Sequence, residues 1–508
     1  MIVPERLESI PRRPVPPDSR KHLALSLERA LAPFRPHVAV LDSVRALSHP
    51  ETMLVITGQQ PSFLGGPLYN VYKALHAIRL ARALTVFWEV PVLPVFWNHS
   101  DDHDIAEVHH LWLQNPNLDL FKVGLVGASS GRIPLGRIHY DAERHHLRAT
   151  KEVLLQNLPA GSEREPAIEL FLPRSGETVS CAFTRVLLEL FGPHGLIVLE
   201  PDWIREPLSR ALANVVAVDL QGALEVGAER LRRAGLEPAI DPREAALLWR
   251  VENDRRHALR PCEGGYRYDG ESGSRSGAEL ATEILQDPGG FSAGALLRPL
   301  VQDLALPVAA YVGGWGELLY HAELPPAREA ADVPVTAFVP RLSATLVDGE
   351  TRVALERLGV EVRDVLARRG VVPATDPCST PGSPLAERLR QIAADSSARL
   401  LAERGALAEI ERGLGQQLKK AADTFQGLVD RIATKAERVE ANARGSDNRY
   451  RRRISNALFP RDAPQERIRG ALEFVARHGR EWLDLLLEEL EPLPTEHWIV
   501  NLIEEAPK

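Results

Sequence analysis

The sequence has few cysteines, no long apolar run and no excess of basic residues. Its three cysteines, Cys181, Cys262 and Cys378, lie far apart and form no CxxC pair, so they support neither a disulfide framework nor a cysteine zinc site. No stretch approaches the roughly 18 uninterrupted apolar residues of a membrane-spanning helix, and the N-terminal residues lack the apolar region of a signal peptide. We therefore expect a cytoplasmic protein with reduced thiols.

The charge balance argues against several classes of partner. The formal net charge is −8, and acidic residues are interspersed with the arginines. We therefore expect no nucleic acid partner, no membrane partner, and small molecules as ligands. The chain also lacks the GxxxxGK(S/T) loop that binds nucleotide phosphates. With 508 residues, 44% hydrophobic and 26% charged, the composition is that of a globular protein with roughly two to four structural units.

Apolar strands that alternate with amphipathic helices predict the fold of the first 375 residues. Residues 53–57 (MLVIT) and 92–97 (VLPVFW) predict two buried strands. Between them, Pro67 is suited to begin a helix to about residue 83, because proline at the first helical position lacks a donor that the helix would not use. This order favours a right-handed βαβ unit. Further strands are expected at 196–200, 308–312 and 335–339, so we predict an α/β fold with a doubly wound parallel sheet.

The composition changes near residue 375. Residues 375–384 (TDPCSTPGSP) predict a linker, and the chain beyond it is rich in charge, alanine and leucine. Apolar residues then recur every seven positions in two series, which define a coiled-coil seam. The series are Leu400, Leu407, Leu414, Ala421 and Leu428, and Leu418, Phe425, Ile432 and Val439. We expect two long antiparallel helices that turn near residues 413–415, and a last strand at 497–502 that rejoins the sheet.

An apolar seam left in water would be an association surface. We therefore expect a homodimer held largely by residues 384–444. Replacement of Leu418, Phe425 and Ile432 by charged residues should give monomers.

Polar clusters follow the first two predicted strands. Ligands bind at the carboxyl ends of strands in open α/β sheets, and both clusters fall there. The candidates for substrate binding in these clusters are Gly58, Gln59, Gln60, Asn98 and Asp101. The amides of Gln59 and Gln60 suit the hydroxyls and carboxylates of a substrate.

His103 lies between two carboxylates, Asp102 and Asp104. Imidazole titrates near neutral pH, and a carboxylate can hold it in one tautomer, so these three residues are candidates for general acid–base catalysis. The alternatives are a solvated strand end or a metal site. The residues of that metal site would be His99, His103, Glu107 and His110. Because the nearby carboxylates suffice as hydrogen-bond partners, we expect no metal requirement.

Gly65 and Gly66 precede the helix that Pro67 begins. Free backbone N–H groups there would attract an anion, and the alternative is a tight turn without a ligand. Tyr69, in the first turn of this helix, is a candidate substrate contact. Lys73 is a candidate for holding an anionic cofactor if its side chain reaches back along the helix, and is otherwise a solvated surface lysine.

A second glycine-rich segment, residues 311–320 (YVGGWGELLY), follows a predicted strand. Its spacing is not that of a dinucleotide loop. Gly313, Gly314 and Glu317 are candidates for a wall of the ligand site, and close backbone packing is the alternative. Arg298 and Arg341 lie beside these elements and could bind a carboxylate, although lone arginines are more often surface charges.

Six segments, in order along the chain, resemble the BshC family, the cysteine ligases of bacillithiol synthesis. They are 56–81 (ITGQQPSFLGGPLYNVYKALHAIRLA), 94–110 (PVFWNHSDDHDIAEVHH), 191–202 (FGPHGLIVLEPD), 296–324 (LLRPLVQDLALPVAAYVGGWGELLYHAEL), 334–341 (PVTAFVPR) and 458–487 (LFPRDAPQERIRGALEFVARHGREWLDLLL). The resemblance covers most of the chain. It departs at residues 100–104, where Ser-Asp-Asp-His-Asp replaces the usual Gly-Glu-Asp-His-Asp, and this bears on the exact substrate.

The resemblance implies a Rossmann-like catalytic core with insertions over residues 1–375. It implies a coiled-coil dimerisation domain over 376–455 and C-terminal helices that return to the core over 456–508. The implied reaction joins the carboxyl group of cysteine to the amine of glucosaminyl malate, which gives bacillithiol. A carboxylate does not condense with an amine unaided, and ATP is a candidate activator. The alternatives are a nucleotide-dependent acyl or nucleotidyl transferase and a non-catalytic coiled-coil scaffold.

Overall fold

The computed structural model describes residues 2–12, 18–125, 131–140, 144–218, 220–269, 273–372, 384–442 and 447–502. The chain forms two compact units, residues 1–346 with 464–508, and residues 347–463. The second unit thus begins before the composition changes at residue 375. The predicted linker lies outside the described residues except for Pro384, and so does Cys378.

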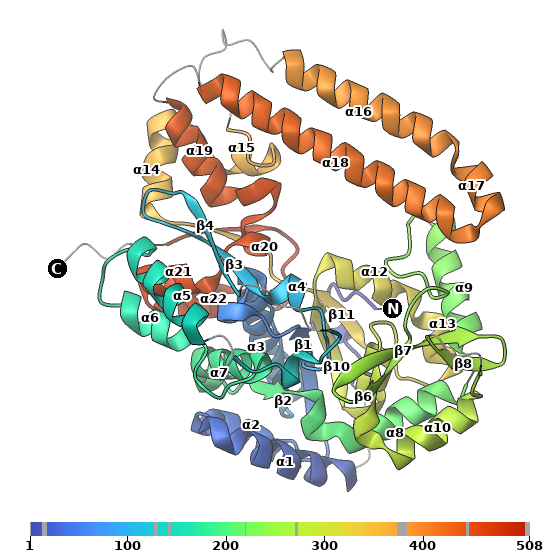
Figure 1. Ribbon diagram of the computed structural model, residues 1–508. Helices are drawn as coiled ribbons and strands as arrows, with labels where there is room; N and C mark the ends of the chain where they lie inside the picture. Colours follow the sequence, from blue (N-terminus) through green and yellow to red (C-terminus); the bar gives the residue numbers. More distant parts are fainter. Residues whose placement is uncertain are drawn as a thin grey trace. The chain divides into compact units, whose positions relative to one another are not determined.

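A five-stranded sheet with the order β11–β10–β1–β2–β5 is the centre of the first unit (Figure 1). All neighbouring strands are parallel, as in the predicted α/β fold. The strands are β1 Met53–Gln59, β2 Val92–Asn98, β5 Ile197–Leu199, β10 Val308–Gly313 and β11 Ala337–Pro340. Their apolar side chains are almost all buried, as expected of a parallel sheet with helices on its faces.

Helix α3 (Leu68–Trp88) connects β1 to β2 and begins directly after Pro67, as predicted. It packs on β1 and β2, and it also contacts α22 (Glu481–Glu489) near the C-terminus. Because both sides are covered, its apolar residues are buried around most of its circumference. Each fully buried leucine or isoleucine contributes roughly 1.5–3 kcal/mol. The helix is therefore a central core element that fixes the ends of β1 and β2.

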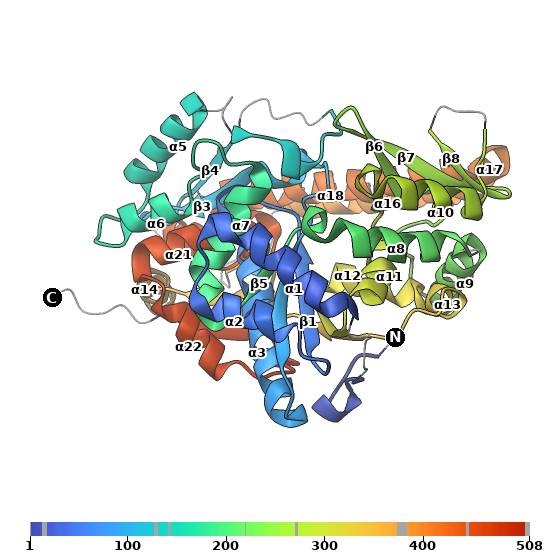
Figure 2. The same ribbon diagram turned by 90° about the horizontal axis from the view of Figure 1, so that it is seen from below.

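The remaining helices of the first unit surround this centre, with α2 beside β5 in Figure 2. They are α1 Asp18–Leu31, α2 Val38–Ala46, α4 Ile105–Val108, α5 Arg144–Asn157, α6 Arg164–Phe171, α7 Val179–Phe191, α8 Arg205–Val216, α9 Leu220–Arg233, α10 Gly277–Gln286, α11 Arg298–Ala305, α12 Trp315–Glu323, α13 Pro325–Ala330, α20 Gln465–Ile468 and α21 Ala471–His478. Helix α7 contacts both β2 and β5.

A four-stranded antiparallel sheet with the order β8–β7–β6–β9 is inserted between α9 and α11. Its strands are β6 Leu248–Glu252, β7 Arg255–Cys262, β8 Gly265–Tyr268 and β9 Phe291–Ala293. A separate hairpin joins β3 (His110–Gln114) to β4 (Leu120–Gly124). The inserted sheet was not among the predicted elements, and it supplies residues of the site described below.

The predicted last strand forms as β13 (Trp498–Asn501), but it does not rejoin the parallel sheet. It pairs with β12 (Ala344–Val347) in a two-stranded sheet. The edge of the parallel sheet at β11 is already occupied, because the N–H of Phe338 donates to the carbonyl oxygen of Ile2 at 2.8 Å. Ile2 thus bonds to the β11 edge, and β13 lies outside the parallel sheet.

The second unit contains a helical hairpin, in which α16 (Pro384–Ala402) and α17 (Arg404–Ile410) pack on α18 (Arg412–Asn442) (Figure 1). The chain reverses at Glu411, between α17 and α18, two residues before the turn predicted near 413–415. Gly415 is inside α18, and a Cβ there would lie 3.1 Å from the carbonyl oxygen of Arg404. The glycine thus permits close packing of α17 and is not a helix breaker. The other helices of this unit are α14 Gly349–Leu358, α15 Val362–Ala367 and α19 Asp447–Leu458.

Within the described residues, no single helix is long and apolar enough to cross a membrane. One bent pair, residues 201–216 with 220–233, meets the criteria of length and composition. Its apolar side chains, such as Leu212 and Leu224, are buried in the core of the protein.

Candidate active site

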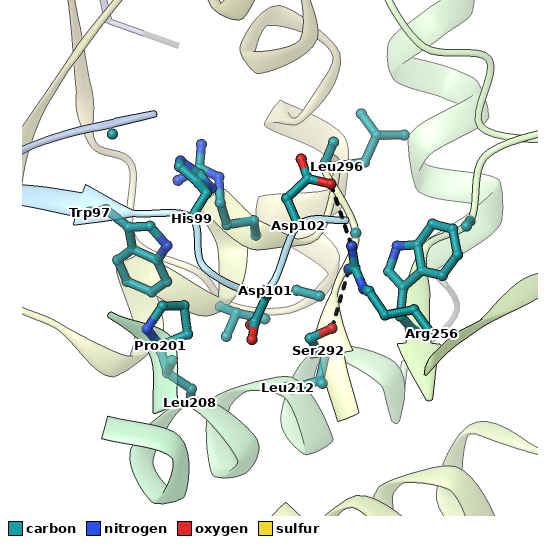
Figure 3. A pocket seen from close by; sticks show the side chains of 18 of the residues that line it. Trp97, His99, Asp101, Asp102, Pro201, Leu208, Leu212, Arg256, Ser292 and Leu296 are labelled. Carbon is teal, nitrogen blue, oxygen red and sulfur yellow. Dashed lines mark hydrogen bonds and ion pairs between the residues drawn. The ribbon is translucent and has the colours of Figure 1, made fainter. Parts of the chain in front are cut away.

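A cavity of about 520 Å³ lies at the carboxyl ends of β1 and β2 (Figure 3). On one side it is lined by residues that follow these two strands, and on the other by α8, α11 and the inserted antiparallel sheet. Eight predicted site residues line it, namely Gly58, Gln59, Gln60, Asp101, Asp102, His103, Arg298 and Glu317. The strand-end location inferred from the sequence is therefore where the structure has its cavity.

Gln60 links the ends of the two strands. Its amide donates to Asp102 Oδ2 at 2.8 Å and to Glu107 Oε2 at 3.0 Å. The backbone N–H of His99 donates to the carbonyl oxygen of Gln59 at 3.0 Å. These bonds hold the segment after β2 against the end of β1, so Asp102 faces the cavity in a fixed position.

Lys73 is only 2% exposed, so it is not a solvated surface lysine. Its ammonium donates to the carbonyl oxygen of Gly58 at 2.7 Å and to Gln59 Oε1 at 2.8 Å, and it pairs with Glu317 Oε2 at 2.7 Å. The side chain does reach back along α3, as helical side chains tend to do. Lys73 does not line the cavity and contacts two residues that do, Gln59 and Glu317.

Glu317, on α12, bonds to residues of α3 and β10 beside the cavity. It accepts bonds from the N–H of Gly314 at 2.8 Å and the hydroxyl of Tyr311 at 2.7 Å, in addition to the pair with Lys73. Burial alone would raise the pKa of Glu317, but Lys73 and the N–H of Gly314 outweigh it, and the pKa is lowered. The cavity therefore contains a carboxylate that stays ionised at neutral pH.

Arg298 is buried at the start of α11 and is not a surface charge. Its guanidinium donates to Gln302 Oε1 at 2.8 Å and to the hydroxyl of Tyr320 at 3.2 Å. It also lies 5.0 Å from the centre of the Tyr311 ring. A buried guanidinium and the Glu317 carboxylate thus line the same part of the cavity.

Asp101 is neutralised by Arg205, which the sequence did not suggest. The guanidinium binds both carboxylate oxygens, at 2.6 Å and 3.0 Å, and also contacts Asp202. A bidentate pair of this kind is among the stronger protein interactions. Asp101 therefore fixes the cavity wall to α8.

The surroundings of His103 differ from those expected. Its Nδ1 lies 3.0 Å from a guanidinium nitrogen of Arg256, whereas Asp102 Oδ1 is 3.7 Å away, beyond hydrogen-bonding distance. The carboxylate of Asp104 accepts from the N–H of Ala106 at 3.1 Å and caps α4 instead of orienting the imidazole. A short polar side chain before a helix commonly acts as such a cap. The partner of His103 is thus an arginine and not a carboxylate.

Arg256 packs on the ring of Trp249 at 4.5 Å, and this ring also meets the imidazole of His103 at 4.9 Å. In Figure 3, Arg256 lies between Asp102 and Ser292, with dashed lines to both. Trp249, Arg256 and Ser292 belong to the inserted sheet, which sequence reasoning missed. The sequence did contain one turn signal, Asn253-Asp254, between two short segments of apolar and basic residues. In the structure both residues have positive φ in the turn that joins β6 and β7.

Other predicted residues support the cavity without lining it. Asn98 is buried and donates to Ser180 Oγ and Thr184 Oγ1, both at 2.9 Å. The Lys73 ammonium and the Arg341 guanidinium lie 5.9 Å and 5.6 Å from the centre of the Tyr69 ring.

The predicted glycines Gly65, Gly66, Gly313 and Gly314 do not line the cavity. A Cβ on Gly313 would lie 2.6 Å from the Phe338 ring, and Gly314 precedes α12. Gly65 and Gly66 have positive φ and form a tight turn. The first N–H of α3, on Leu68, donates to the carbonyl oxygen of Arg469 at 2.8 Å. This donor of the expected anion site therefore already has an acceptor within the protein.

The metal alternative has no geometric support. Within the described part of the chain, no group of three or more histidine, cysteine, aspartate or glutamate residues is arranged to hold a metal ion. Burial, together with Arg298 and Lys73, keeps the pKa of His99 well below its usual range. Glu107 Oε2 accepts a hydrogen bond from the amide of Gln60 at 3.0 Å.

Comparisons with known proteins agree with this architecture. Residues 3–342 match the family model "Bacillithiol biosynthesis BshC, N-terminal Rossmann-like domain", and residues 344–502 match "Bacillithiol biosynthesis BshC, C-terminal coiled-coil domain".

Related proteins match over most of their length. A protein of Koribacter versatilis is 30% identical over 88% of this chain and 84% of its own, and one of Geobacillus kaustophilus is 30% identical over 92% and 88%. A protein of Thermus thermophilus is 30% identical over 94% and 93%. All three are named "Putative cysteine ligase BshC".

A solved structure of Mycobacterium tuberculosis methionyl-tRNA synthetase aligns over 87% of this chain and 91% of its own, with 11% identity and a TM-score of 0.23, which is too low to bear on fold or function. The two family models together span nearly the whole chain, which belongs to the BshC family of bacillithiol biosynthesis.

Proposed function

We propose that this chain is a ligase that joins the carboxyl group of cysteine to the amine of glucosaminyl malate, which gives bacillithiol. Membership of the BshC family supports the reaction type, because the relatives are named as cysteine ligases. The cavity at the ends of β1 and β2 is the proposed site. Its volume of about 520 Å³ lies in the range of roughly 300–1,000 Å³ that is usual for small-molecule sites.

The observation that carries the proposal is the pair of opposite charges in this cavity. The carboxylate of Glu317 is held ionised, and the buried guanidinium of Arg298 lies beside the same network. An amino acid bears one ammonium group and one carboxyl group. Glu317 is suited to bind the ammonium group of cysteine, and Arg298 is suited to orient a carboxyl group.

ATP remains the proposed activator on chemical grounds alone, because hydroxide is a poor leaving group from a carboxylate. The start of α3 does not fit the phosphate-binding role, since the N–H groups of Gly65, Gly66, Leu68 and Asn70 already donate to carbonyl oxygens of the protein. ATP is therefore a variable in the assay.

The test is incubation of the purified protein with cysteine and glucosaminyl malate, with and without ATP, followed by mass spectrometry. The expected product has the summed mass of both substrates less one water. Serine in place of cysteine is the matched control for the thiol. No joined product in any arm, from a folded protein, would contradict the proposal, and a product from another acid and amine would favour a different acyl transfer.

We also propose that the protein is a cytoplasmic homodimer. Of the predicted seam residues on α18, Phe425, Leu428 and Ile432 are 37%, 48% and 58% accessible in the single chain, whereas Leu414 and Leu418 are half-buried. A shallow groove beside them is lined by Ala421, Phe425 and Leu428. Exposed apolar side chains at heptad spacing are suited to pack against a second copy.

A further inference from the structure

Arg256 is almost completely buried, and its position against His103 is fixed from three sides. It donates to His103 Nδ1 at 3.0 Å and to Ser292 Oγ at 3.2 Å, and its guanidinium packs on the Trp249 ring at 4.5 Å. Its side chain is 5% exposed. Asp102 Oδ1, 3.6 Å from the guanidinium, adds an ion pair on the side of the imidazole.

This contact determines which nitrogen of His103 carries the proton. A guanidinium has only N–H donors and no acceptor, and it remains protonated in proteins. Nδ1 must therefore accept the hydrogen bond from Arg256 through its lone pair. A neutral imidazole whose Nδ1 is unprotonated carries its proton on Nε2.

The charges around the ring decide whether it is neutral. Burial lowers the pKa of His103, and Arg256 on β7 and Arg132 lower it further. Asp102 and Asp104 in the adjacent segment raise it but do not outweigh the other effects. The imidazole therefore stays neutral at physiological pH, with Nε2–H as its single donor.

We propose that His103 is a neutral hydrogen-bond donor, through Nε2–H, to the substrate carboxyl oxygen that gains negative charge as the amide forms, and that Arg256 is the positioning residue that fixes this tautomer. The inference rests on the proposed function. It replaces the expectation that His103 takes a proton from the sugar amine, because a base needs an unprotonated nitrogen that faces the substrate. Here the unprotonated nitrogen faces Arg256.

The tautomer can be measured without any activity. Protein with ¹⁵N-labelled histidine is studied by NMR, and the His103 signals are assigned by difference from the His103→Gln variant. We expect a protonated Nε2 and an unprotonated Nδ1 in the wild type. Arg256→Met should abolish this preference, and Arg256→Lys, which retains a donor, should restore it. Arg250→Met is the matched control, since Arg250 packs on Phe291 in the same sheet but does not line the cavity.

Activity then tests the role of the donor. Glutamine retains an N–H donor near the position of Nε2 but cannot act as a base. We expect His103→Ala to lose about 10²–10³-fold in turnover, the usual effect of one such donor, and His103→Gln to recover part of this loss. Because the folded pKa of His103 is lowered, the acidic limb of the rate profile should lie below its ordinary value of 6.5, and Arg256→Met should move it upward.

The outcomes separate the two proposals. A wild-type protein with the Nδ1–H tautomer overturns this inference, and so does a folded His103→Gln variant as inactive as His103→Ala. A protein with the expected tautomer that makes no product from cysteine and glucosaminyl malate overturns the proposed function and leaves the tautomer assignment intact. Circular dichroism verifies the fold of each variant.

Discussion

Gly58 lines the cavity and has little room for a side chain. A Cβ there would lie 2.7 Å from His99 Nε2 and 2.9 Å from the carbonyl oxygen of Trp97. The second contact is to backbone of the paired strand β2, which cannot move alone. We expect Gly58→Ala to destabilise the protein by about 1–3 kcal/mol, the usual cost of overpacking. Urea unfolding measures it.

Gly161→Ala is the matched control for Gly58→Ala. Gly161 is exposed, and nothing lies within 4 Å of its Cβ position. A similar loss of stability in both variants would show that the effect comes from glycine itself and not from the contact with His99.

Lys73 and Glu317 form a buried ion pair, and its contribution to stability can be measured by replacing each residue singly and then both together. Lys73→Met leaves a buried carboxylate without its cation, which typically costs about 3–5 kcal/mol. Glu317→Gln in the same chain removes that charge, so the double variant should be more stable than Lys73→Met. Unfolding free energies of the four proteins measure the coupling. Equal stability of the double variant and Lys73→Met would disprove the coupling.

The same pair predicts a dependence on pH. In the wild type the pKa of Glu317 is lowered, so its stabilising effect is present above the ordinary value of 4.5 and is lost as the pH falls through the folded pKa. In Lys73→Met the pKa of Glu317 should rise, and protonation then relieves the buried charge. The stability deficit of this variant should therefore shrink between about pH 7 and pH 5. A constant deficit would contradict this.

Single residues were predictable from the sequence where a local rule places them. Gln59, Gln60 and Asp102 follow buried strands, and the strand-end rule brings them to one cavity. Lys73 was not predictable in this way, because its burial depends on Glu317, which the chain supplies much later. The role of Asp104 was misjudged for a related reason, since a cap and a catalytic carboxylate look alike in a sequence.

At the scale of elements, strongly apolar segments were predictable and short amphipathic ones were not. β1, β2 and α3 were located because their burial on both sides leaves long apolar runs. The strands β6 and β7 were missed because their side chains are charged, aromatic and partly exposed. They nevertheless supply Trp249 and Arg256 to the cavity, so these two site residues were missed together with their strands.

The helical hairpin of the second unit depends on small side chains. Ala393 on α16 is buried, and Ser397 one turn later donates to the carbonyl oxygen of Ala422 on α18. Leucine at position 393 would push the helices apart. We expect Ala393→Leu to cost about 1–3 kcal/mol, measured by thermal unfolding of the full chain. Ile392→Leu, at an exposed neighbouring position, is the control and should have no effect.

At the scale of the whole molecule, the order of strands and helices was predictable, but the position of the C-terminal strand was not. β13 pairs with β12, and Ile2 bonds to β11 at the edge of the parallel sheet. Pairing between segments that are distant in sequence leaves no periodic signal in either of them. The heptad pattern of α18 was predictable because it requires only one helix, whereas the pattern does not identify the surface that would cover it.

The proposed dimer is tested by charges placed on this seam. Replacement of Leu418, Phe425 and Ile432 by glutamate should give monomers, because each charge would be desolvated at the interface. The control replaces three exposed apolar residues of the first unit, Val86, Leu236 and Leu285, by glutamate. Both proteins then carry the same added charge, and only the seam variant should sediment as a monomer. A seam variant that remains dimeric, or a wild type that is already monomeric, would show that α18 is not the dimer interface.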